Sequence, residues 1–138
     1  MTITAPAACF LAATALHAGF QATVTALVYP ALARVPADRW TVEHDRHSRS
    51  ITPLVGVVYL ALAGATVWIL AADRGPWSYA GAVLALGVAL VTGLGAAPLH
   101  GRLASPDPVL TRRLLRVDRV RAGLAVLLLI CACGVAFG

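Results

Sequence analysis

Four long stretches of the chain carry no Asp, Glu, Lys or Arg, and these stretches limit the fold more than any other feature. They are residues 1–33, 51–72, 77–99 and 122–138. A helix that crosses a bilayer needs about 20 mostly apolar residues. The composition agrees, because 59% of the residues are hydrophobic and only 12% are charged, whereas about 25% are charged in a typical soluble domain. The sequence therefore predicts an all-α fold, a four-helix transmembrane bundle that forms one domain over residues 1–138.

Prolines and capping residues set the predicted ends of the four helices. The expected helices span about 5–33, 38–72, 77–99 and 108–137. Asp38 and Asp107 are the expected N-caps of the second and fourth helices, since a carboxylate there accepts backbone N–H bonds. Pro30 and Pro98 should bend or end the first and third helices. Because the fourth apolar stretch is short, the second and fourth helices are expected to extend beyond the membrane on the side that carries most charges.

The arginines predict the orientation of the bundle. All eleven basic residues are arginines, and every one except Arg74 falls on the same side of the predicted membrane. The positive-inside rule makes that side cytoplasmic. We therefore expect an integral plasma membrane protein with both termini outside and with loops 34–50 and 101–121 in the cytoplasm. The net charge of +5 then reflects topology, so the expected partner is the lipid bilayer and no nucleic acid.

A histidine cluster is predicted at the cytoplasmic edge of the membrane. The decapeptide EHDRHSRSIT at 43–52 places His44 and His47 three residues apart, on one face of a helix. A helix rises 1.5 Å per residue, and this rise brings His100, just past the third apolar stretch, to the same depth. Pairs of this spacing on facing helices often hold metals in bundles. His44, His47 and His100 are thus candidate ligands for a transition metal, iron or copper ahead of zinc.

Charged and polar residues at a similar depth complete the predicted site. Asp118 or Glu43 would supply a carboxylate ligand or a hydrogen-bond partner for a ligating histidine. Arg49 and Arg121 would stabilise anionic charge. His17 is an ionisable residue within a span, which makes it a functional candidate, although it lies about 18 Å in depth from Tyr29. The predicted catalytic residues are Arg49, Asp118 and Arg121, and the predicted pocket residues are His17, Tyr29 and Glu43.

Other interpretations of the same residues stay open at this point. Asp45–Arg49 and Asp118–Arg121 have the spacing of helical ion pairs, so the polar residues would form a structural network without a ligand. Exposed pairs of this kind contribute at most about 1 kcal/mol. A metal-free pocket for an organic ligand is a further interpretation. A pH-responsive interface built on the four histidines is the last.

The third predicted helix carries a stripe of small residues. Gly81, Ala85, Ala89, Gly93 and Ala97 recur every four residues. Small side chains at this spacing allow a neighbouring membrane helix to approach closely. The stripe therefore predicts close packing within the bundle or a homo-oligomer interface.

Four short motifs resemble a family of small four-helix bacterial membrane proteins that is similar to the anthrone oxygenase-like proteins. The motifs are YP at 29–30, W…EH..HSRSIT at 40–52, PLHGRL at 98–103 and LLRVDRVR at 114–121. The resemblance implies a four-helix membrane fold and an oxygenase acting on a hydrophobic small molecule. The residues that it marks are Pro30, His44, His47, Arg49, Pro98, His100, Leu103, Asp118 and Arg121.

Two classes of function follow from these observations. The first is a membrane-embedded oxidoreductase of the oxygenase type, whose histidines bind a metal or take protons from a hydrophobic small molecule as general bases. The second is a non-enzymatic membrane protein with a structural network of His, Asp and Arg. That protein would carry a small molecule or a metal ion, or would bind a partner subunit.

Overall fold

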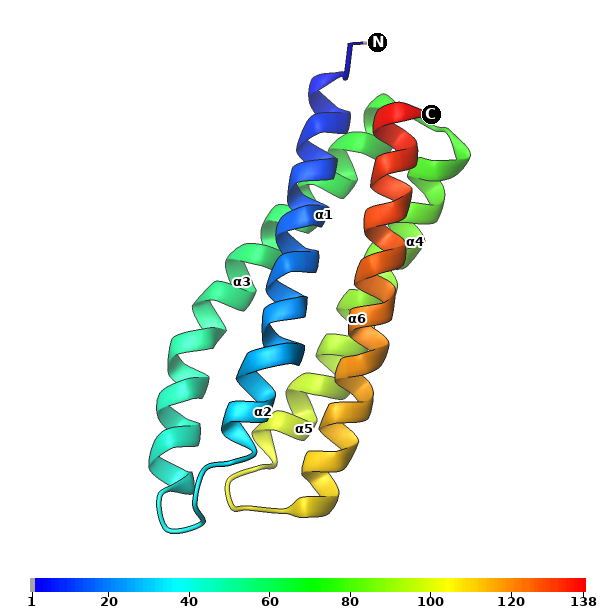
Figure 1. Ribbon diagram of the computed structural model, residues 1–138. Helices are drawn as coiled ribbons and strands as arrows, with labels where there is room; N and C mark the ends of the chain where they lie inside the picture. The colour runs from blue at the N-terminus through cyan, green and yellow to red at the C-terminus, as the bar shows by residue number, and fades with distance from the viewer. Residues whose placement is uncertain (1) are drawn as a thin grey trace.

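The computed structural model describes residues 2–138 and shows four helical spans (Figure 1). Each span is long and apolar enough to cross a membrane. This confirms the predicted all-α, four-helix transmembrane bundle. The first span consists of α1 (Ala5–Thr23), the π-helical segment η1 (Val24–Val28) and α2 (Tyr29–Leu32), and the second is α3 (Trp40–Ala72). The third consists of α4 (Pro76–Leu90), the π-helical segment η2 (Val91–Ala96) and α5 (Ala97–Gly101), and the fourth is α6 (Pro108–Phe137).

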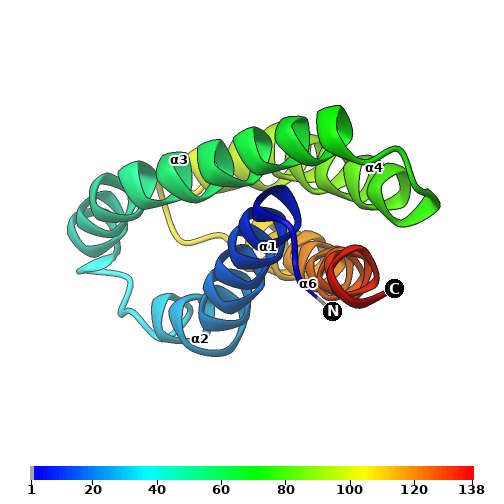
Figure 2. The same cartoon turned by 90° about the horizontal axis from the view of Figure 1, so that it is seen from above.

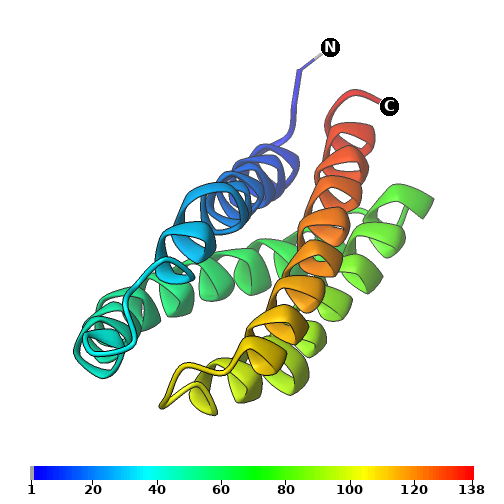
Figure 3. The same cartoon turned by 60° about the horizontal axis from the view of Figure 1, so that its bottom comes forward.

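The four spans form a bundle in which each helix has two main neighbours. α1 packs against α3 and α6, and α4 packs against the same two helices. Figure 2 shows this order from above, with α3 beside α4 and α1 beside α6. The connections at residues 33–39 and 102–107 lie at the end opposite both termini (Figures 1 and 3). This end is called the arginine-rich end, because the arginines other than Arg74 lie on this side.

Within the most apolar window of each span, the outer faces of the helices are apolar. In each span, between 17% and 33% of the residues in the most apolar window are buried within the bundle. The remainder present large hydrophobic side chains outward, such as Leu60, Leu94 and Val126. Helices that are apolar on all sides are typical of membrane spans, because lipid then covers the faces that the bundle does not.

The helix bounds lie within two residues of the predicted ones, and the two predicted caps have different outcomes. Asp107 is confirmed as the cap of α6, where its Oδ1 accepts from the backbone N of Val109 at 2.7 Å and of Leu110 at 3.0 Å. Asp38 was the wrong residue for α3. That helix begins at Trp40, with Arg39 at the N-cap and no side-chain cap bond. Residues 37–39 form a turn.

Pro30 and Pro98 bend their helices locally and do not end them. Each lies two residues after a π-helical segment, and an α-helical turn follows. A proline has no N–H and its ring collides with the carbonyl four residues earlier. The wider π-helical turn avoids that collision by changing the hydrogen-bond register. Each π segment therefore rotates the following turn, which carries Tyr29 in the first span and His100 in the third.

The stripe of small residues does not stay on one face. Gly81 and Ala85 are buried in the bundle, and a Cβ added at Gly81 would lie 2.9 Å from Cζ of Phe10. Ala89 and Gly93 are exposed. Steps of four residues advance by roughly 40° around a helix of 3.6 residues per turn, so the stripe winds from the interior to the surface. The homo-oligomer interface that it predicts rests on its exposed half and stays a prediction.

Two apolar core clusters lie one above the other along the bundle axis. The cluster nearer the termini contains Ala7, Phe10, Ala13, Leu62, Ala65, Ile69, Ala85, Leu128 and Ala132. The cluster nearer the arginine-rich end contains Val24, Tyr29, Leu32, Trp40, Ala96, Leu103 and Leu114. Between them, in chain order along the helices, lie the buried polar residues His17, Gln21, Asp118 and Arg121. A polar layer thus divides the core.

Candidate functional site

The polar layer is built around Asp118 of α6, whose side chain is buried. Its Oδ1 accepts from Nε2 of Gln21 at 2.7 Å, and its Oδ2 accepts from Oγ1 of Thr25 at 2.7 Å. One turn later, Nη1 of Arg121 lies 3.5 Å from Oδ1. The carboxylate therefore accepts two short hydrogen bonds, one from a residue of α1 and one from a residue of η1. Arg121 is its buried counter-ion at longer range.

Arg121 keeps most of its hydrogen-bonding capacity. A guanidinium has five N–H donors, and among residues 2–138 the one hydrogen bond of Arg121 within 3.5 Å is the long one to Asp118, while the phenol of Tyr29 lies close enough to interact with it. Its Nε has no partner among residues 2–138, although the side chain is buried. A buried cation with unused donors, inside a membrane bundle, is a strong candidate for binding an anionic or acidic group.

His17 lies in the same polar layer, further from the arginine-rich end. Its ring is fully buried and meets the ring of Tyr59 edge-on, with 5.3 Å between centroids. The hydroxyl of Tyr59 hydrogen-bonds to that of Thr92 on η2. Within the described chain, neither ring nitrogen of His17 has a hydrogen-bond partner. His17 thus stands beside the site, and a tyrosine connects it to the third span.

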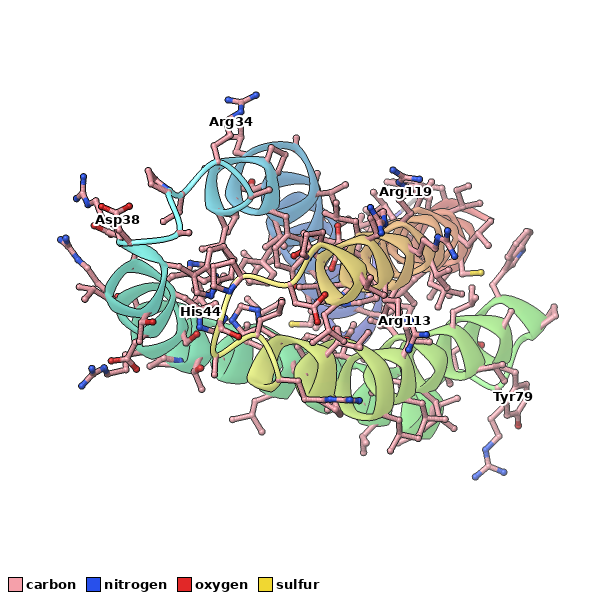
Figure 4. The ribbon with its side chains drawn as sticks, turned by 90° about the horizontal axis from the view of Figure 1, so that it is seen from below. Arg34, Asp38, His44, Tyr79, Arg113 and Arg119 are labelled. Atoms are coloured by element: carbon pink, nitrogen blue, oxygen red, sulfur yellow. The ribbon has the colours of Figure 1, made fainter. Side chains whose placement is uncertain are left out.

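The three other histidines come together at the arginine-rich end, as their depth in the sequence predicts. The ring centroid of His100 lies 4.6 Å from that of His44 and 5.6 Å from that of His47. On its other side, His44 stacks on Trp40, with centroids 5.4 Å apart. The indole N–H of Trp40 donates to the carbonyl of Leu103 at 2.8 Å. Figure 4 shows His44 pointing into the bundle from α3.

The hydroxyl of Ser48 contacts both His44 and His100. It donates to the carbonyl oxygen of His44 at 2.8 Å, and a serine has one proton to donate. Nε2 of His100 lies 3.0 Å from Oγ of Ser48, and which of the two atoms donates depends on the tautomer of the imidazole. With the hydroxyl proton on the carbonyl, Nε2 carries the imidazole proton and the lone pair is on Nδ1. This atom is buried and has no partner in the part of the chain that the structure describes.

A pocket of about 200 Å³ connects the histidine cluster to the polar layer. It is mostly apolar, with Arg121 from α6, Thr92 from η2 and the imidazoles of His47 and His100 as its main polar groups. Tyr29 adds a phenol, and its ring centroid lies 6.4 Å from that of His100. The full lining is Phe20, Val24, Tyr29, His47, Ile51, Thr52, Val55, Thr92, Ala96, Ala97, His100 and Arg121.

The donor geometry does not fit one metal ion shared by three histidines. An imidazole lone pair lies in the ring plane, so ligands of one metal point their ring edges at it. His44 and His100 instead lie partly face to face, with 34° between their planes. Within residues 2–138, no group of three or more His, Cys, Asp or Glu side chains is placed to hold a metal ion. The iron, copper or zinc site stays a prediction.

Several predicted site residues lie outside the pocket. Arg49 is exposed and pairs with Asp45. Glu43 pairs with Arg39 at 3.0 Å. Asp118 does not line the pocket, but it contacts Arg121, which does. A similar depth therefore does not by itself place a polar residue in the pocket.

The sequence interpretation missed Ser48, Gln21 and Thr25. Gln21 and Thr25 are polar residues in a charge-free span, and such residues are functional candidates in membranes. That signal would have found them. Ser48 follows His44 by one helical turn, a spacing that places both on one face.

The chain was compared with protein-family models, with curated proteins and with solved structures, and none of the three comparisons finds a match.

Proposed function

We propose that this membrane protein binds a hydrophobic small molecule with a weakly acidic C–H or O–H group and oxidises it with dioxygen. The observation that carries the proposal is the apolar pocket that has a cation, Arg121, and two imidazoles, His47 and His100, in its wall. An apolar cavity with a few convergent polar groups is the usual form of a small-molecule site. The resemblance of the motifs to the anthrone oxygenase-like family favours oxidation over other reactions.

His100 is the proposed general base. Its Nδ1 has no hydrogen-bond partner among residues 2–138, its Nε2 contacts Oγ of Ser48, and the residue lines the pocket. A base must be unprotonated and able to reach the substrate proton. His47 lies against His100 and lines the same pocket, so it is placed to share or pass on the proton.

Arg121 is the proposed partner of the anion that deprotonation creates. Its unused donors would bind the oxygen onto which the negative charge is delocalised. In a water-poor pocket, this interaction is stronger than in bulk water. Gln21 and Thr25 hold Asp118 in place, and Asp118 in turn holds the guanidinium.

The reaction balances without a further reductant. The base removes one proton from an activated methylene, and the carbanion adds dioxygen and a proton to give a hydroperoxide. Loss of water from the hydroperoxide forms a ketone. One methylene and one dioxygen thus give one carbonyl and one water, and the carbon supplies all the electrons.

Anthrone is a suitable probe, because its methylene is acidified by two rings and a conjugated carbonyl. Purified wild type in micelles should consume one dioxygen per anthraquinone formed, measured with an oxygen electrode and by chromatography. His100→Asn should lower the rate by about 10²–10⁴-fold, and Arg121→Gln by about 10²–10³-fold. The matched control is Arg46→Gln, an exposed arginine of α3, which should retain the wild-type rate.

The same experiment separates the enzyme from the alternative, a carrier. Saturable binding of anthrone with no dioxygen uptake above the uncatalysed rate would favour a non-enzymatic small-molecule carrier. Equal rates for wild type and both pocket variants would show that neither His100 nor Arg121 takes part in the mechanism.

The proposed location is the plasma membrane, with the arginine-rich end in the cytoplasm, as the positive-inside rule predicts.

A further inference from the structure

A second cavity opens on the outside of the bundle, between the third and fourth spans at the arginine-rich end. Its volume is about 450 Å³. The inner wall is apolar, and Gly95 leaves space beside Val117, whose Cγ1 would lie 3.3 Å from a Cβ added at the glycine. The full lining is Leu94, Gly95, Pro98, Leu99, Arg102, Arg113, Arg116 and Val117. These residues define the arginine groove.

The three arginines of the groove have no acidic partner. Within residues 2–138, the ion pairs are Arg39–Glu43, Arg49–Asp45 and Arg121–Asp118. Arg113 and Arg116 are three residues apart on α6, on the same side of the helix, and all three groove arginines are exposed. Figure 4 shows Arg113 between α6 and the third span, whereas Arg119 points to the opposite side of α6. The groove therefore concentrates uncompensated positive charge over an apolar wall.

We infer that the arginine groove binds one anionic phospholipid. The phosphate would lie among Arg102, Arg113 and Arg116, and an acyl chain would follow the apolar wall toward Leu94. The charge requires an anion, and the lipid-facing apolar wall requires that the anion carry a hydrocarbon chain. Basic pockets between membrane helices on the cytoplasmic side bind acidic lipids in this way. This inference does not depend on the proposed oxidation.

The groove shares a wall with the pocket. The residues of the third span that line the groove are Leu94, Gly95, Pro98 and Leu99. Those that line the pocket are Thr92, Ala96, Ala97 and His100. The π-helical segment η2 and the turn after it thus have the lipid on one side and the pocket on the other. A bound phospholipid would therefore support the wall that presents His100.

Native mass spectrometry of the delipidated protein tests the inference. Phosphatidylglycerol and phosphatidylcholine with the same acyl chains are added separately, and one-to-one complexes are measured. Wild type should prefer phosphatidylglycerol by on the order of tenfold, because this lipid carries a net negative charge, whereas the cationic choline of phosphatidylcholine cancels the charge of its phosphate and is repelled by the arginines. Arg113→Gln/Arg116→Gln should lose this preference. Arg112→Gln/Arg119→Gln removes the same charge from α6 outside the groove and should keep it.

Three results would overturn the inference. Equal binding of the two lipids by wild type would show that no anionic headgroup is recognised. Equal losses in the two double variants would show a diffuse effect of charge. Displacement of phosphatidylglycerol by millimolar inorganic phosphate would identify a site for free anions. If Arg113→Gln/Arg116→Gln does not elute as a folded species, Arg102→Gln serves as the groove variant. It should also weaken the preference for phosphatidylglycerol, and an unchanged preference would contradict the inference.

Discussion

Oγ of Ser48 lies 3.0 Å from Nε2 of His100 and 2.8 Å from the carbonyl oxygen of His44. One hydroxyl group therefore connects the backbone of α3 to the imidazole of the third span. With the hydroxyl proton on the carbonyl, this contact favours the tautomer of His100 that has its proton on Nε2 and its lone pair on Nδ1. The orientation of the proposed base thus depends on a neighbour that does not line the pocket.

Ser48→Ala should lower the rate of anthrone oxidation by on the order of tenfold, since the base remains but its tautomer is no longer held. The pH–rate profile should also change, which a purely structural loss would not cause. Ser48→Thr retains the hydroxyl and should restore most of the rate. Ser50→Ala is the matched control, because Oγ of Ser50 bonds to the carbonyl of Arg46 on the exposed side of α3. An unchanged profile in Ser48→Ala would contradict the positioning role.

Asp118→Ala should lower the free energy of unfolding by about 3–5 kcal/mol. The substitution leaves Arg121 as an unpaired buried cation and removes the acceptor of Gln21 and Thr25. Unfolding by SDS in mixed micelles measures the change. Asp45→Ala removes the carboxylate of an exposed pair and should cost at most about 1 kcal/mol. Similar losses in the free energy of unfolding for the two variants would show that the buried pair contributes no more to stability than the exposed pair.

Gly81→Ala should destabilise the bundle by about 1–3 kcal/mol. The added Cβ would lie 2.9 Å from Cζ of Phe10, so this fully buried ring would have to shift within the core. Phe10→Leu in the same chain should recover part of the loss. At Gly64 a Cβ would meet no other atom of residues 2–138 within 4 Å, so Gly64→Ala should be neutral or slightly stabilising. The prediction fails if both alanines have the same effect.

Removal of metal separates the two roles of the histidines. If His100 is a base, protein treated with a chelator should oxidise anthrone at the rate of untreated protein. Elemental analysis of protein purified without chelator checks the same point. Loss of activity that iron or copper restores, together with loss of bound metal in His44→Ala and His100→Ala, would establish the metal site that the sequence predicts and would replace the proton-transfer mechanism.

The orientation in the membrane is tested by labelling single cysteines in a cysteine-free chain. Ser105→Cys lies in the connection at the arginine-rich end, and Arg74→Cys lies in the turn between α3 and α4. A membrane-impermeant maleimide added to intact cells should label the Arg74→Cys variant. It should leave the Ser105→Cys variant unlabelled until the cells are broken. The reverse pattern would invert the proposed topology.

The sequence predicted well how deep each polar residue lies along the bundle axis, but it predicted poorly which side of its helix the residue occupies. Depth follows from the rise of 1.5 Å per residue, so His44, His47 and His100 were expected at one level, and their rings do meet. Arg49 was expected at the site by the same reasoning and instead faces outward to Asp45. The side of a helix that a residue occupies depends on how the helix is rotated against its neighbours.

The charge-free stretches by themselves determined the number of helices, their approximate bounds and the membrane as solvent, because bilayer thickness and helix rise leave no other solution. The tertiary structure alone decided which polar groups share a cavity. The π-helical segments before Pro30 and Pro98 rotate the turns that carry Tyr29 and His100. Packing of α1 on α6 buries Asp118 and Arg121 in a layer of their own. The prolines that accompany the π-helical turns are visible within each span, but the groups that each rotated turn meets depend on contacts between spans distant in the sequence.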